Sequence, residues 1–150
     1  MAGLNSFIGQ ELDNRLITIE AGLIHRIFMA INHPNQFDKA VLLDKPYSNK
    51  ALPSFILGTL MDTPKIYGLL GLNINNVLLS RESIISHQPI YAGYSLNIKT
   101  VLENAYEKQA TINPIGFLVL NILGQYKNEL IFCCERVLAV RGGFSRKGNV

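Results

Sequence analysis

The spacing of apolar residues along the chain changes near Gly71. Before that point it is helical, and after it apolar and polar residues alternate as strands require. The apolar residues of the first helical stretch share one side and are Leu23, Ile24, Ile27, Phe28 and Ile31. We expect an amphipathic helix that follows Thr18 and ends at 32–34, because the residue before a proline avoids the α region. His25 falls on its polar side and is expected to be exposed.

A second apolar stretch opens at Pro53 and runs from 54 to 61 with almost no polar face. Such a pattern is typical of a helix that is buried on most sides, so we expect it at the centre of the fold. Thr63-Pro64 has the residues of a new helix start, and Gly71 those of a helix end. The helix is therefore expected to kink at 63–64 and to continue from 65 to 70.

Four alternating stretches then predict strands at 77–88, 95–108, 115–124 and 129–141. In the second, Leu96 and Ile98 alternate with polar residues, which predicts one covered and one exposed face. The third is apolar on both faces apart from Asn121, so it belongs inside a sheet or against a second subunit. Turn residues at 124–128 predict a hairpin between the last two strands. The order of elements predicts an α+β domain whose antiparallel sheet wraps around the central apolar helix.

Length and composition narrow the possibilities. The 150 residues suit one domain, which we assign to 1–141, followed by a flexible basic tail at 142–150. Hydrophobic residues make up 48% and charged residues 17%, which excludes disorder and indicates that another subunit covers some apolar surface. The net charge is +3, and its basic excess gathers near the end of the chain, at Arg141, Arg146 and Lys147, and forms no stripe that could follow a phosphate backbone. Nucleic acid is therefore not an expected partner.

The two cysteines, Cys133 and Cys134, are adjacent and would point to opposite faces of a strand, so they cannot readily bridge each other. This favours a reducing compartment. The first residues lack the apolar core of a signal peptide, and the longest apolar runs are short or broken by Glu135 and Arg136. We expect a cytoplasmic protein with no membrane partner. The histidines and cysteines lack metal-ligand spacing, and 68–71 is a helix end and no dinucleotide loop, so neither metal nor cofactor is expected.

Four local patterns resemble one known family. They are Ala51-Leu52-Pro53-Ser54-Phe55, Glu82 with His87-Gln88-Pro89-Ile90-Tyr91-Ala92-Gly93, Tyr106-Glu107-Lys108, and the Gly124 turn before a strand ending in Arg141. In order and spacing they resemble the MaoC-like dehydratases of the hot-dog fold, and most of all the non-catalytic half-domain of (R)-specific enoyl hydratases and 3-hydroxyacyl dehydratases. The resemblance implies a hot-dog fold and a ligand that is an acyl-CoA or acyl-carrier-protein thioester.

The chain departs from the family at the catalytic motif. Catalytic members carry Asp-x-Asn-Pro-x-His after the first helix, and aligning that motif on Pro34 places Ile31, His33 and Gln36 at its Asp, Asn and His. Gln88 also replaces an arginine of the family pattern, and Tyr94 an aspartate. Hydration of an enoyl thioester needs one group to take a proton from water and another to deliver it to carbon. Without this pair, the resemblance implies binding without turnover.

Two residues remain as candidate catalysts. His33 and Asp38 lie in a polar segment, 32–52, which is long enough to be a lid. A folded loop can bring them together as a displaced acid/base pair, although a histidine beside a proline is more commonly a turn residue. His87, at a strand end, more commonly supports the strand or a subunit contact.

The resemblance also implies where the substrate binds. In the family the acyl chain runs along the subunit interface beside the central helix, whose first N–H groups face the thioester carbonyl. The candidate substrate-binding residues are Pro53, Ser54, Phe55, Ile56, Leu57 and Met61. Packing in the core is the ordinary role of such apolar residues, and both roles are compatible.

Three functions remain open. The first is a substrate-binding subunit of an (R)-3-hydroxyacyl-thioester dehydratase or enoyl hydratase in fatty-acid metabolism, in a dimer with a catalytic hot-dog subunit. The second is a stand-alone dehydratase or acyl-CoA thioesterase with non-standard catalytic residues. The third is a homodimeric scaffold without catalysis. The first is favoured, and the sequence leaves open whether the dimer is a homodimer or a heterodimer.

Overall fold

The structure is a computed structural model that describes residues 2–32, 47–109 and 112–144. In chain order its elements are α1 (Ala2–Asn5), β1 (Glu11–Thr18), α2 (Ala21–Asn32), η1 (Ser54–Leu60), α4 (Thr63–Leu70), η2 (Ile74–Asn76), β2 (Val77–Ser86), β3 (Ser95–Gln109), β4 (Pro114–Tyr126) and β5 (Glu129–Arg141). The strands form one antiparallel sheet in the order β1-β3-β4-β5-β2. The expected α+β class is confirmed.

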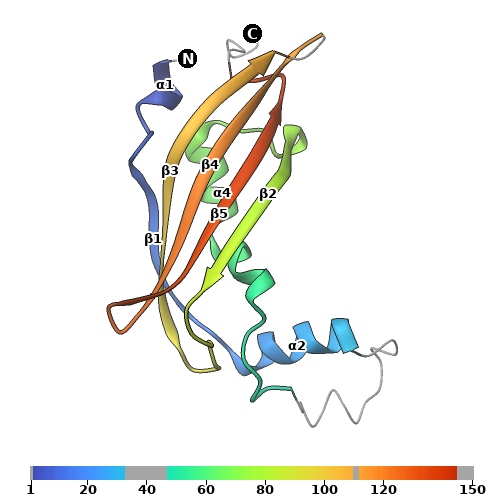
Figure 1. Ribbon diagram of the computed structural model, residues 1–150, viewed down its shortest axis with the longest axis vertical. Coiled ribbons are helices and arrows are strands. Elements are labelled where there is room, and N and C mark those ends of the chain that lie inside the picture. The colour runs from blue at the N-terminus through green and yellow to red at the C-terminus, as the bar shows by residue number, and fades with distance from the viewer. Residues whose placement is uncertain (1, 33–46, 110–111, 145–150) are drawn as a thin grey trace.

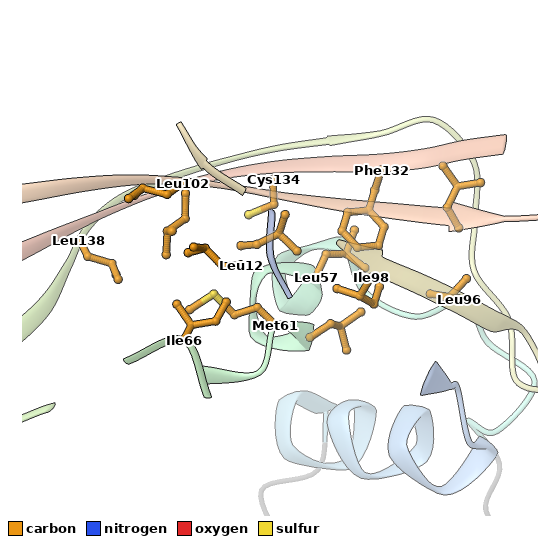
Figure 2. Close-up of a cluster of buried hydrophobic side chains, with 14 of the residues drawn as sticks. Leu12, Leu57, Met61, Ile66, Leu96, Ile98, Leu102, Phe132, Cys134 and Leu138 are labelled. Atoms are coloured by element: carbon orange, nitrogen blue, oxygen red, sulfur yellow. The ribbon is translucent and has the colours of Figure 1, made fainter. Parts of the chain in front are cut away.

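The helices η1 and α4 cover one face of the sheet, which we call the inner face, and α2 lies beyond one end (Figure 1). Alternate residues of the central strands point to this face and are fully buried: Leu96, Ile98 and Leu102 of β3, and Leu118, Leu120 and Ile122 of β4. Figure 2 shows Leu57, Met61 and Ile66 between the helices and the sheet. Burial of each such side chain contributes roughly 1.5–3 kcal/mol, so this layer holds the fold together.

The strands predicted after Gly71 are confirmed to within three residues at each end. The third of them, β4, lies between β3 and β5 inside the sheet, as its apolar faces predicted. The hairpin from β4 to β5 turns through Lys127 and Asn128, which both have positive φ angles, 50° and 65°. This pair suits a tight two-residue hairpin turn.

The first strand, β1, was not predicted from the sequence. Its register shifts between Glu11 and Asp13, where it pairs with β3, and Leu12 and Asp13 are consecutive buried residues. A bulge of this kind interrupts the alternation of apolar and polar residues on which strand prediction depends. Leu16, which is exposed, weakens the pattern further.

The central helix is shorter and less buried than predicted. The segment predicted as one helix over 54–61 is the 3-10 helix η1, which buries Leu57, Gly58 and Leu60 and leaves Phe55 57% exposed. A new helix, α4, starts after Asp62, whose side chain accepts a hydrogen bond from the N–H of Lys65. It ends at Gly71 with φ 67°, which confirms the predicted stop.

Helix α2 is confirmed, but the prediction that His25 is exposed is wrong. His25 is 3% exposed, and its ring stacks on Tyr47 with 6.0 Å between the centroids. The same tyrosine stacks on Phe28. His25 is therefore covered by Tyr47, a residue outside the helix, which no local pattern indicates.

The two cysteines are free thiols, with Cys134 buried and Cys133 partly exposed, as expected for adjacent residues of a strand. At the other end of β5, residues 142–144 lie against the sheet. The N–H of Phe144 donates a hydrogen bond to Oε1 of Glu107, and its ring occupies the space where a side chain at Gly116 would lie. The sequence assigned these three residues to the tail.

Candidate functional site

The candidate substrate-binding residues divide into an accessible group and a buried group. Ser54 and Phe55 are exposed, while Pro53 and Ile56 are partly buried. Leu57 and Met61 are 1% and 3% exposed and pack in the core, as Figure 2 shows. The candidate residues open to a ligand are thus those at the start of η1 and just before it. The two candidate catalysts, His33 and Asp38, lie outside the described residues.

The accessible end of η1 lies next to the end of β2. The N–H of Leu52, just before η1, donates a hydrogen bond to the carbonyl of Ile90, just after β2, at 2.7 Å. Further along, Gly58 of η1 lies against Glu82 of β2. The two elements therefore run side by side in opposite directions between these contacts, and we call this stretch the η1–β2 contact line (Figure 1).

Alternate residues of β2 along this line face the inner side of the sheet. Ile84 and Ser86 pair with Cys134 and Phe132 of β5, which are both fully buried on that face. Directly paired residues of an antiparallel sheet share a face. Ile84 is nevertheless only partly buried and Ser86 is exposed, because β2 is the last strand of the sheet.

The outer edge of β2 is apolar. Leu78, Leu79 and Ile85 are 63%, 52% and 61% exposed, and no strand among the described residues pairs with this edge. The opposite edge of the sheet, β1, carries one large exposed apolar residue, Leu16. An unpaired strand with several exposed apolar side chains is a ready surface for pairing with another chain.

An ion pair joins β2 to β5 beneath η1. Nη2 of Arg136 lies 3.2 Å from Oε1 of Glu82, and their side chains are 12% and 18% exposed. The same oxygen accepts a hydrogen bond from Sγ of Cys134. Burial, aided by Glu82, raises the pKa of that thiol to about 12. A Cβ at Gly58 would collide with Oε1 of Glu82 and lie 3.0 Å from Nη2 of Arg136, so η1 rests directly on the pair.

Sequence reasoning missed this pair. Glu82 was noted only within the family pattern, and Arg136 only as a charge that interrupts an apolar run. The signal becomes visible once β2 and β5 are paired in register, because Glu82 and Arg136 are then direct partners on the covered face. A second pair, Arg81 with Glu135 at 3.0 Å, lies one residue away on the outer face and is exposed.

Polar contacts also attach the helices to β1. Nζ of Lys65 in α4 lies 2.5 Å from the buried carboxylate of Asp13, and this hydrogen bond raises the pKa of Lys65. The guanidinium of Arg15 donates to the carbonyl of Leu60 at the end of η1. The 3-10 helix η1 is therefore held to both β1 and β2, and α4 to β1, which fixes the position of the η1–β2 contact line.

Two hollows lie away from this line. One of about 290 Å³ is on the outer face around Glu103, Asn121 and Cys133, and another of about 400 Å³ lies between α1, the end of α4 and Phe144. None of the candidate substrate-binding residues lines either hollow. Within the described ranges no group of three or more His, Cys, Asp or Glu residues is arranged to hold a metal ion. No helix of that same part of the chain is long and apolar enough to cross a membrane.

Comparison with known proteins found a matching family model. The family model described as "FAS1-like, dehydratase domain region" matches residues 6–131. No curated protein matches the chain in sequence.

Several solved structures are similar in fold. One is the ChsH1–ChsH2 complex of Mycobacterium tuberculosis, with 14% identity and a TM-score of 0.66 over 99% of this chain and 94% of that one. The HadBC (3R-hydroxyacyl-ACP dehydratase) complex of the same organism has 13% identity and a TM-score of 0.59 over 88% and 99%. A MaoC-like dehydratase of Rhodospirillum rubrum has 13% identity and a TM-score of 0.56 over 90% and 92%. These likenesses confirm the hot-dog fold.

Proposed function

Because the chain belongs to the FAS1-like dehydratase-region family, we propose that it is an acyl-thioester-binding subunit that pairs with a catalytic hot-dog subunit. The complex would act as an (R)-3-hydroxyacyl-thioester dehydratase or enoyl hydratase in fatty-acid metabolism. The thioester carrier in this proposal is CoA or an acyl carrier protein.

The observation that carries the proposal is the apolar outer edge of β2. Leu79 and Ile85 expose more than half of their surface there, and Phe55 of η1 is exposed to a similar degree. A second hot-dog chain that paired with this edge would cover these side chains and bring its own residues to the η1–β2 contact line. Two of the similar structures are complexes of this kind of chain with another, which supports the proposal.

The proposed roles of the two subunits follow from the catalytic residues that this sequence lacks. The positions of the catalytic Asp and His are occupied by Ile31 and Gln36, and neither side chain can exchange a proton near neutral pH. In the proposal the partner supplies the acid and the base. This chain supplies Pro53, Ser54, Phe55 and Ile56 as an accessible wall, with the N–H groups of Ser54 and Phe55 at the start of η1, where a helix leaves its first donors without intrahelical partners.

The proposal includes a cytoplasmic location. It is supported by the two cysteines, which are free thiols and point to opposite faces of β5, so that they do not bridge each other. Thiols persist where the surroundings are reducing.

A binding and activity assay on the purified chain tests the function. A short acyl-CoA is expected to raise the melting temperature, since a ligand at 100 times its Kd stabilises by about 2.7 kcal/mol. Crotonyl-CoA is expected to bind without being hydrated. Hydration that His33→Ala or Asp38→Ala abolishes would contradict the subunit role, and release of free CoA would identify a thioesterase. If no acyl thioester stabilises the protein, the scaffold is the correct alternative.

The edge of β2 is tested separately by sedimentation. Ile85→Lys places a charge on the proposed interface and is expected to dissociate this chain from its catalytic hot-dog partner. The matched control is Leu16→Lys, which alters an apolar residue on the other edge strand that is even more exposed than Ile85. If both variants or neither change the sedimenting mass, the partner does not bind at β2.

A further inference from the structure

The η1–β2 contact line is apolar at its accessible end and charged further along. At its accessible end lie Phe55, Ile84 and Ser86, which present mainly apolar surface. At Gly58 the line reaches the ion pair of Glu82 and Arg136. From Ser86 to Glu82 the strand rises by about 13 Å, and from Ser54 to Gly58 the 3-10 helix rises by about 8 Å. The apolar stretch before the charges is therefore short.

No chain can pass between η1 and the ion pair. The space where a Cβ of Gly58 would lie is already occupied by Oε1 of Glu82. A ligand that extends further along the line must instead pass beside η1, across the part of the pair that is still exposed, and remove the water that reaches both side chains there. Beyond the pair, on the same face of β2, Leu79 is exposed again. The charges thus separate two apolar stretches of one surface.

Covering the pair with methylene groups is unfavourable. A hydrocarbon offers no hydrogen bond in exchange for the water it displaces, and loss of solvation of a charged group costs free energy. Nε of Arg136 already lacks a hydrogen-bond partner, so the guanidinium is incompletely satisfied before any ligand covers it. The penalty falls only on ligands long enough to reach the pair.

We propose that the Glu82–Arg136 pair limits the acyl chains that this subunit binds to short ones. The inference rests on the proposed function, since it assigns the chain length of the thioester bound at the same site. It predicts that butanoyl-CoA binds and that dodecanoyl-CoA binds at least tenfold more weakly.

The wild-type chain provides the first test, by calorimetric titration with both thioesters and with CoA alone. Tighter binding of butanoyl-CoA than of dodecanoyl-CoA supports the inference. Equal or tighter binding of dodecanoyl-CoA overturns it and leaves the proposed function intact. Failure of both thioesters to bind more tightly than CoA overturns the proposed function as well.

A double variant tests whether the pair is the cause. Glu82→Leu with Arg136→Met replaces the charges by apolar groups of similar size and makes the line continuously apolar. Such replacements of buried ion pairs commonly preserve stability. The variant is expected to bind dodecanoyl-CoA at least as tightly as butanoyl-CoA. The matched control, Arg81→Met with Glu135→Leu, changes the pair on the outer face of the same strands and is expected to keep the wild-type preference.

A second variant does not depend on changes in the core. Ser86→Lys places a charge at the exposed start of the line and is expected to weaken butanoyl-CoA binding at least tenfold. Ser83→Lys, on the outer face of the same strand, is expected to have no effect. Equal effects of the two lysine variants would overturn the assignment of the line as the acyl site.

Discussion

Replacing Arg136 by alanine breaks the ion pair beneath η1 and leaves the carboxylate of Glu82 with the Cys134 thiol as a donor. Breaking a buried pair typically costs roughly 3–5 kcal/mol, because the remaining charge is uncompensated. Glu82 retains 18% exposure, so we expect the lower end, about 3 kcal/mol. For a domain of this size, this corresponds to a fall in Tm of about 6–12 °C.

The second ion pair of the same two strands is the control. Arg81→Ala breaks the pair with Glu135, whose side chains are 68% and 36% exposed, and the expected loss is about 0–1 kcal/mol. Both variants are compared with wild type by urea unfolding, followed by far-UV circular dichroism at one protein concentration. Losses that differ by less than about 1 kcal/mol would refute the claim that the inner pair is buried and structurally important.

Two further predictions concern the packing around two glycines and the ionisation of the Cys134 thiol. Gly58→Ala should lower stability by about 1–3 kcal/mol through its collision with Glu82. Gly68→Ala, in α4 with open space around it, should raise stability by about 0.5–1 kcal/mol in the same unfolding assay, and the opposite ranking would contradict the packing described. The pKa of Cys134 is raised in the folded protein from 9.0 to about 12, so its contribution to stability is complete below pH 9 and is lost as the pH rises above it. Wild type should therefore lose stability between pH 9 and pH 12 more steeply than Cys134→Ser, by up to about 1.4 kcal/mol per pH unit, and parallel curves would refute the shift.

Much of the fold follows from local pattern. The four later strands show clear alternation, and the hairpin between β4 and β5 has turn residues at its centre. The strand β1 shows no such alternation, because its bulge places Leu12 and Asp13 on the buried side together. The close approach of Gly58 in η1 to Glu82 is a property of packing between distant segments, so the helical pattern of 54–61 does not indicate it.

The candidate site was predicted less completely. The accessible residues Ser54 and Phe55 were identified, and Leu57 and Met61 proved to be core residues. The Glu82–Arg136 pair depends on two strands whose partners are 54 residues apart in the chain. Such a contact becomes apparent only when the register of the sheet is known.

The central proposal is that an acyl thioester lies along the η1–β2 contact line. The direct test is photo-labelling with a butanoyl-CoA analogue that carries a diazirine at the end of its acyl chain, followed by mass spectrometry of the labelled peptides. We predict labels at Phe55, Ile84 or Ser86, and none when excess butanoyl-CoA competes. Competable labels around Phe144 or Cys133, in the two hollows away from this line, would contradict the account.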